Sequence, residues 1–268
     1  MEFYLQFASA TLGRLLTYRF NAFFKMINRL IFMAVQVYIW KIVYGNDKQL
    51  FFHTQFGTIS LHDMISYTVM SHVMYCFIQS CSVSSLNSQI SSGNISQLLV
   101  RPISIKMYLF IESLCESLIS VLLQALPLLI FGILVYRITI PSFLTCLLFV
   151  LFLINGFLIY YLLTTIVAAS AFWVVKAGPA DALVNGLIKI FSGVWIPVWF
   201  LSGWLLHLSE LLPLQNIYFL PIAVYLQKLT GREIIRNCLT QGLWIAGLYL
   251  VMDLVWRKGE TKVMIQGG

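Results

Sequence analysis

The stretch PSFLTCLLFVLFLINGFLIYYLLTTIVAASAFWVV, residues 141–175, decides the fold class of the chain. It contains no charged side chain and is longer than the roughly 20 apolar residues that cross a bilayer as a helix. A membrane β-strand would alternate apolar and polar residues, and this stretch does not. It therefore predicts a transmembrane helix that tilts, kinks or extends beyond the membrane.

The whole chain has the same character. Of its 268 residues 60% are hydrophobic and only 10% are charged, whereas soluble domains carry about 25% charged residues. A soluble core of this size could not bury so much apolar surface. We therefore predict an all-α, polytopic membrane protein that forms a single domain over residues 1–268.

Six apolar stretches are candidates for transmembrane helices. They cover residues 26–44, 62–89, 107–135, 141–175, 182–205 and 235–256. The second is rich in serines, which could satisfy one another between helices. Residues 1–25 predict an amphipathic helix at the membrane interface. Residues 206–231, which contain Pro213 and Pro221, predict an external re-entrant segment after the fifth span.

The distribution of cations predicts the orientation. The chain has 17 Lys and Arg against 10 Asp and Glu, a net charge of +7. Cations gather on the cytoplasmic side of membrane proteins, which accounts for this excess without a nucleic-acid partner. A cytoplasmic N-terminus places ten cations inside and six outside. Both termini and residues 91–105 are then expected in the cytoplasm.

The segment 91–105 is polar between two apolar stretches and predicts a short helix. Asn94 can cap its start, and Gln97 stands three residues later, as in a capping box. Pro102 disfavours helical backbone at Arg101 and so ends the helix.

One face of this predicted helix is apolar and consists of Ile95, Leu98 and Leu99. A helix this short is marginal alone and must pack on something. It could lie on its own membrane boundary or on neighbouring loops, or it could dock a soluble partner. Physical reasoning alone favours neither.

Three parts of the chain resemble the ABC-2 type exporter permeases. GNISQLLVRPISIKMY, residues 93–108, is similar to the loop that forms the coupling helix of those proteins. SGVWIPVWFLSGWL, residues 192–205, with LPLQNIYFLPIAVYL, residues 212–226, is similar to their fifth span and external segment. WRKGETKVMIQGG, residues 256–268, resembles their basic tail. Leu214 departs from the pattern, which often has a bulkier aromatic residue there.

The resemblance implies half of an exporter in a bacterial cytoplasmic membrane. Two six-helix subunits would pair, as a homodimer or as two related permeases, and each would dock a cytoplasmic ATPase subunit. The chain has no Gly-x4-Gly-Lys-Ser/Thr phosphate loop, so ATP and Mg²⁺ are expected on the partner and no catalysis on this chain. The rivals are an ion-gradient-driven secondary transporter and a membrane anchor of another complex. The substrate is not specified by such a fold.

The resemblance assigns the coupling role to the short helix. The residues expected to meet the ATPase are Asn94, Ile95, Gln97, Leu98, Leu99, Arg101 and Pro102. ATP binding would move this loop and shift the helices that enclose the substrate path.

Three charged residues within the spans are candidates for the substrate path or, in a secondary transporter, for proton carriers. Glu112 and Glu116 stand four apart and would share a helix face. The alternative is that they pair with cations at the membrane boundary, such as Arg101 or Lys106. Lys189 lies in the fifth span, where a charge costs about 2.5–3.5 kcal/mol by insertion scales. It should face a partner or water, or its side chain should extend to the interface.

Aromatic residues beside a proline are further candidates for the substrate path. Pro197 should break the fifth helix. Trp195 and Trp199 would share a face there and could line an exit path, or they could form an interfacial belt. Asp253 and Arg257 predict an ion pair one turn apart. The histidines show no zinc-site spacing, and the cysteines are interpreted as small packing residues.

Overall fold

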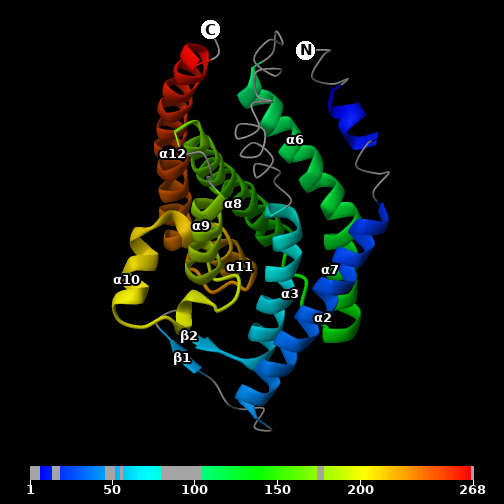
Figure 1. Ribbon diagram of the computed structural model, residues 1–268. Coiled ribbons are helices and arrows are strands. Elements are labelled where there is room, and N and C mark those ends of the chain that lie inside the picture. Colours follow the sequence, from blue (N-terminus) through cyan, green and yellow to red (C-terminus); the bar gives the residue numbers. More distant parts are fainter. Residues whose placement is uncertain are drawn as a thin grey trace.

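The computed structural model describes residues 7–13, 19–45, 52–54, 57–79, 104–173 and 178–266. Figure 1 shows helices that run side by side through the molecule, with a small hairpin at one end and the C-terminus at the other. The elements are α2 (Arg19–Tyr44), β1 (Phe52–Thr54), β2 (Gly57–Ile59), α3 (Leu61–Ile78), α6 (Ile105–Ser120), a π-helical turn (Val121–Ala125), α7 (Leu126–Tyr136), α8 (Phe143–Ala169) with a 3-10 turn (Ser170–Phe172), α9 (Gly178–Phe191), a 3-10 turn (Val198–Phe200), α10 (Trp204–Leu211), a 3-10 turn (Pro213–Asn216), α11 (Phe219–Tyr225) and α12 (Gly231–Gln266).

Among the residues that the structure describes, four helical stretches are long and apolar enough to cross a membrane. They are Phe20–Tyr44, Ile105–Tyr136, Phe143–Phe172 and Gly231–Thr261. The second stretch contains α6, the π-helical turn and α7. Pro127 lacks an N–H and its ring crowds the preceding turn, and the adjacent π-helical turn accommodates both effects. The prediction of a helical membrane protein is confirmed.

The helix α3 lies at the centre of the bundle and is buried on all sides. Most serines of the predicted span lie outside the described residues, and two polar side chains of α3 bond within the helix. Thr68 donates to the carbonyl of Met64, and Ser71 donates to the carbonyl of Thr68. These bonds within the helix satisfy polar groups that have no water nearby. The described helix has 18 residues, and the rest of the predicted span 62–89, from residue 80, lies outside the described residues.

The helix in the predicted fifth span, 182–205, breaks as predicted, but it ends before Pro197 and not at it. Helix α9 ends at Phe191, because Gly193 adopts φ +87° and turns the chain. The Tyr67 hydroxyl donates to the Gly193 carbonyl over 2.7 Å, and a Cβ on Gly193 would lie 2.6 Å from that hydroxyl oxygen. The turn therefore requires glycine, and the helix ends before it reaches Pro197.

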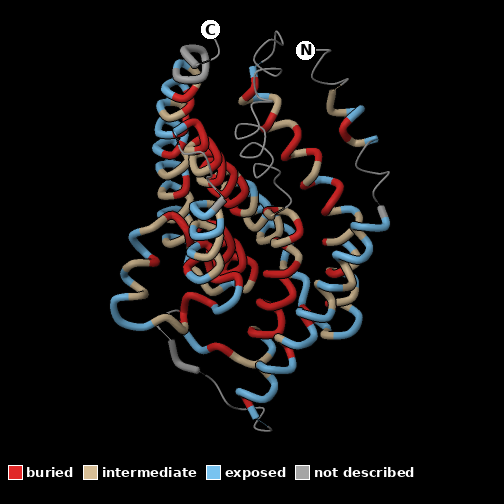
Figure 2. Tube along the Cα trace, in the orientation of Figure 1, coloured by how far each residue is buried: buried red, intermediate tan, exposed pale blue. Residues whose placement is uncertain are grey.

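Residues 212–226 lie inside the bundle. Every residue of α11 is buried (Figure 2), and α11 packs against α8. At Gly156, near the middle of α8, a Cβ would lie 2.7 Å from the Ile217 carbonyl oxygen. The Gln241 side chain on α12 donates to the Asn216 carbonyl over 3.2 Å. The segment thus reaches the middle of α8 and the first third of α12.

The N-terminal part differs from the predicted interfacial helix over residues 1–25. Helix α2 continues from Arg19 to Tyr44, so residue 25 is not a helix end. Residues 7–13 are also helical and pack beside α6, where the rings of Phe7 and Tyr108 are 4.5 Å apart. Residues 1–6 and 14–18 lie outside the described residues.

The close contact at Gly156 predicts a difference between two glycines in long helices. Gly156→Ala should lower the melting temperature, because the added methyl group must displace the Ile217 backbone, at a cost of about 1–3 kcal/mol. Gly247→Ala is the control, because a Cβ at Gly247 meets no atom within 4 Å. Thermal unfolding of both variants in one detergent, followed by size-exclusion chromatography, measures the difference. Equal melting temperatures would contradict the close packing of residues 212–226 on α8.

Candidate functional site

The expected coupling residues precede α6 directly. Asn94, Ile95, Gln97, Leu98, Leu99, Arg101 and Pro102 all lie outside the described residues. The structure resumes at residue 104, and α6 begins at Ile105. The structure shows the contacts of α6, the helix that follows the loop.

The start of α6 is joined to α12 by an ion pair. Lys106 Nζ lies 2.6 Å from Asp253 Oδ1, and Arg257 Nε lies 2.7 Å from Asp253 Oδ2. The Tyr161 hydroxyl on α8 donates to the Lys106 carbonyl. The predicted Asp253–Arg257 pair is confirmed, whereas Lys106 pairs with Asp253 and not with the glutamates of α6. Three helices therefore meet at Lys106, the residue that directly follows the loop 91–105.

A second contact fixes α12 beside the end of α8. The rings of Phe172 and Trp256 meet edge to face, 5.7 Å apart. Gly259 lies against the Phe172 ring so closely that no Cβ would fit. The basic end of α12 is thus packed on the same end of the bundle as Lys106.

Glu112 and Glu116 lie one turn apart on α6, as predicted. Glu112 is only 7% exposed, and Glu116 is half-buried. Both carboxylates engage other groups. Their part in a substrate path stays a prediction.

The expected shared face of Trp195 and Trp199 is wrong, because residues 192–196 are not helical. Trp195 is 58% exposed, and Trp199 is 5% exposed. The Trp199 ring lies edge-on to Tyr67 and Phe219, at 5.0 and 5.5 Å between centroids. Pro197, between them, is buried. Of the two tryptophans, only Trp195 has a ring available to a solute.

Lys189 is half-buried near the end of α9. Its Nζ lies 5.7 Å from the centroid of the Trp195 ring, within the range of a cation–π contact. The lysine predicted to need a partner thus has an aromatic one.

Sequence reasoning missed a line of polar contacts between α2, α3 and the turn after α9. Gln36 on α2 donates to the Trp195 carbonyl over 2.9 Å, and His72 on α3 lies 3.1 Å from the Gln36 side-chain oxygen. The Arg29 guanidinium lies 3.4 Å from the centroid of the Tyr75 ring. We name these five residues, Arg29, Gln36, His72, Tyr75 and Trp195, the polar seam.

The signal for the polar seam was present in the sequence. Arg29 and Gln36 are seven residues apart on one predicted helix, which places them on one face. The sequence interpretation counted Arg29 as a cytoplasmic cation, whereas the structure has it half-buried against α3. What the sequence could not show is that His72 and Tyr75 face that side of α2.

A second polar group lies between α8 and α9. The Tyr160 hydroxyl donates to Asn185 Oδ1 over 3.2 Å, and Asn185 Nδ2 donates to Asp181 Oδ1 over 3.0 Å. The Tyr75 ring stacks on Tyr218, which immediately precedes α11, with centroids 6.4 Å apart. Polar and aromatic groups thus extend from α2 into the interior of the bundle.

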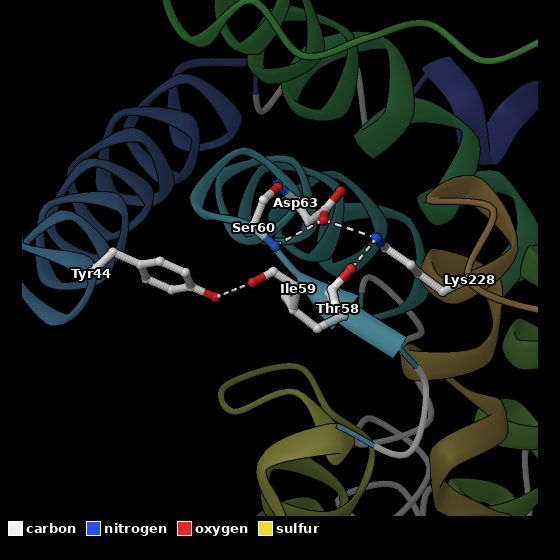
Figure 3. Close-up of polar contacts among 6 residues, drawn as sticks. All are labelled: Tyr44, Thr58, Ile59, Ser60, Asp63 and Lys228. Atoms are coloured by element: carbon white, nitrogen blue, oxygen red, sulfur yellow. Dashed lines mark hydrogen bonds and ion pairs between the residues drawn. The ribbon is translucent and has the colours of Figure 1, made fainter. Parts of the chain in front are cut away.

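The hairpin end of the bundle is closed by a second ion-paired cluster (Figure 3). Lys228 Nζ lies 2.9 Å from Asp63 Oδ2 and donates to the Thr58 carbonyl over 3.1 Å. Asp63 and Ser60 form the capping box of α3. The Tyr44 hydroxyl donates to the Ile59 carbonyl over 3.1 Å. The cluster joins α2, the hairpin, α3 and the chain that follows α11.

Both ends of the bundle contain ion pairs, and the polar seam lies between them. Among the residues that the structure describes, no three His, Cys, Asp or Glu side chains could hold a metal ion. The described cysteines, Cys76, Cys115, Cys146 and Cys238, are free thiols.

Comparison with known proteins agrees with this geometry. The model of a family described as ABC-2 family transporter protein matches residues 49–267. A search of curated proteins gave no match. The family model covers the hairpin, both ion-paired clusters and every described helix from α3 onward, including the tail. This chain belongs to the ABC-2 family of transporter proteins, whose members are membrane permease components and normally work with an ATPase subunit.

Proposed function

We propose that the chain is the permease subunit of an ATP-driven exporter in a bacterial cytoplasmic membrane. A separate nucleotide-binding subunit would bind ATP and Mg²⁺ and dock on the loop 91–105. The observation that carries the proposal is the Lys106–Asp253 ion pair. It connects the helix that follows the expected docking loop to α12, and so gives movement of the loop a route into the bundle.

The proposed topology has six spans. Four are the long apolar stretches described above, and α3 and α9 are the second and fifth. Eighteen residues of α3 extend about 27 Å, close to the thickness of the hydrocarbon core. The 14 residues of α9 reach only about 21 Å, and residues 192–200 would complete the crossing. Residues 206–231 would enter from the outer side and return, as a re-entrant segment.

Two features support this topology. Backbone without regular helix is tolerated at membrane depth only where protein buries it, and residues 212–226 pack against α8 and α12. The Asp63–Lys228 cluster and the Lys106–Asp253 pair then lie at opposite membrane surfaces, where charged groups cost least. Both termini and the loop 91–105 would face the cytoplasm.

The proposed mechanism follows the contacts. Closure of the ATPase subunits would press on the loop and tilt α6. The Lys106–Asp253 pair would carry this movement to α12, and Tyr161 would carry it to α8. The π-helical turn between α6 and α7 is the natural place for the first long helix after the loop to flex.

A second permease subunit would complete the transport path, either as another copy or as a related chain. Many large apolar side chains of α2 are exposed, among them Phe20, Phe24, Phe32 and Tyr38. Such a surface requires lipid or a partner helix. We propose that the second permease subunit covers part of the exposed surface of α2 and that lipid covers the rest.

One observation favours the secondary-transporter alternative. Glu112 is nearly fully buried in a membrane-spanning stretch, as carboxylates in proton relays are. Dependence of transport on ATP hydrolysis separates the two functions.

The docking role of the loop is tested by Leu98→Asp. The change would bury an unpaired charge against the ATPase, at a cost of several kcal/mol, and should abolish pull-down of the ATPase or its substrate-stimulated hydrolysis. Val100→Asp is the matched control, because residue 100 falls on the opposite face of the predicted helix. Wild-type assembly and transport in Leu98→Asp would remove the loop from the coupling role.

The ion pair predicts a defect of a different kind. Lys106→Gln and Asp253→Asn should each retain ATPase binding but lose stimulation of hydrolysis by substrate, by about fivefold or more. The double exchange Lys106→Asp with Asp253→Lys should restore part of it. Arg257→Gln, which removes an exposed cation bound to the same carboxylate, is the control and should keep most stimulation. Full stimulation in both single variants would exclude the proposed route.

The orientation is tested with single cysteines in a variant without native cysteines. Cysteines at Ser92 and Thr261 should resist an impermeant thiol reagent in intact cells, because the cation distribution places both in the cytoplasm. A cysteine at Asn46 should react. Labelling at Ser92 in sealed cells would reverse the topology.

A further inference from the structure

Two cations lie within membrane-embedded helices against aromatic rings. Arg29 lies 3.4 Å from the centroid of Tyr75, and Lys189 lies 5.7 Å from that of Trp195. Both cations are half-buried. A cation inside a membrane protein is costly unless it meets an anion, water or a polar cavity, and a ring face offsets only part of that cost.

The carboxylates that the structure describes interact with groups other than Arg29 and Lys189. Asp63 pairs with Lys228, Asp253 with Lys106 and Arg257, and Glu210 with His207; Asp181 bonds to Asn185, Glu233 to Thr230 and Glu260 to Trp256. Glu112 and Glu116 also have partners. Within the described ranges, no ion pair includes Arg29 or Lys189. Among these residues, the positive charge of Arg29 and Lys189 is therefore available to a ligand.

Arg29 lies at one end of the polar seam, and Lys189 lies beside Trp195 at its other end. Arg29 precedes Gln36 by seven residues on one face of α2, about 10 Å along the helix. The Gln36 side chain donates to the carbonyl of Trp195, and the Lys189 ammonium lies over the Trp195 ring. A molecule that moves along the seam would thus leave one cation and meet the next.

The seam also offers flat apolar surfaces. The Tyr75 ring is half-buried and continues into the stacked ring of Tyr218, and Trp195 exposes more than half of its surface. A guanidinium held flat on a ring keeps its N–H edge free, and that edge matches the two oxygens of a carboxylate, sulfonate or phosphate.

We propose that the polar seam binds the anionic group of an amphipathic molecule, at Arg29 first and at Lys189 second, with the apolar part of the molecule against Tyr75 and Trp195. The proposal rests on the permease function and specifies its substrate class as amphipathic anions. Two successive sites of modest strength suit transport, because a solute must leave each site as readily as it enters.

Equilibrium binding to the purified permease alone, in phosphatidylcholine nanodiscs, tests the proposal. The probes are a dansyl-labelled fatty acid and its trimethylammonium analogue of equal chain length. The wild type should prefer the anionic probe. Arg29→Gln and Lys189→Gln should each weaken its binding about tenfold, and Arg29→Lys, which keeps the charge but loses the paired N–H edge, should retain only part of it. Lys41→Gln, which removes an exposed cation from the same helix α2, is the control and should leave binding unchanged.

Several outcomes decide the proposal. Equal affinity of the wild type for both probes, or unchanged anion binding in a variant without Arg29 and Lys189, would overturn it. If the melting temperature shows that Arg29→Gln does not fold, the test rests on Lys189→Gln alone, and unchanged binding of the anionic probe in that variant would overturn the proposal. Competition by added phosphatidylglycerol would assign the site to lipid headgroups, and binding unaffected by that lipid would assign it to a solute. Because neither ATP nor an ATPase is present, failure of the ATP-driven mechanism would leave this result unchanged.

Discussion

The structure depends on one constraint, which is that the interior of a bilayer offers no hydrogen bonds to an open backbone. Helix α9 ends after 14 residues, so the chain beyond it must find partners within the protein. The Tyr67 hydroxyl donates a hydrogen bond to the Gly193 carbonyl, and the Phe219 N–H donates one to the Ser192 carbonyl. The Gln241 side chain donates one to the Asn216 carbonyl. A glycine in α8 allows the returning chain to approach closely enough to be enclosed. The break in the fifth span therefore depends on the burial of α11, because the returning chain supplies hydrogen-bond partners to the backbone at the break.

This arrangement leaves the bundle with an ion pair at each end and polar groups between the ends. At one end Lys228 and Asp63 join the hairpin, α3 and the chain after α11. At the other, Lys106 and Asp253 join α6 to α12. Between the two lies the polar seam, on the side of α3 that faces α2. Ion pairs can exchange partners without loss of packing, so an exporter that alternates between two states would change at these ends while the core around α3 stays intact.

Much of the fold could be predicted from composition and periodicity, because lipid requires long apolar helices. The stretch at 141–175, the Asp253–Arg257 pair and the geometry of Glu112 and Glu116 all follow from local spacing. Prediction failed where contacts with residues distant in the sequence determine the local structure. The end of α9 depends on Tyr67, which is more than a hundred residues away, and Trp199 is buried because Phe219 returns beside it. Arg29 was interpreted as a topological charge, since its ring partner lies on another helix. The expected coupling residues lie outside the described residues, so their role still rests on the sequence and on the family.

We propose that this chain transports a solute only with a separate ATPase subunit. The most direct measurement is uptake of an amphipathic anion into sealed proteoliposomes that contain the permease, with and without an ATPase subunit that binds it. We expect ATP-dependent accumulation with the intact ATPase and none with an ATPase that binds but does not hydrolyse ATP. Accumulation driven by a proton or sodium gradient, with the permease alone and without nucleotide, would contradict the account and establish a secondary transporter.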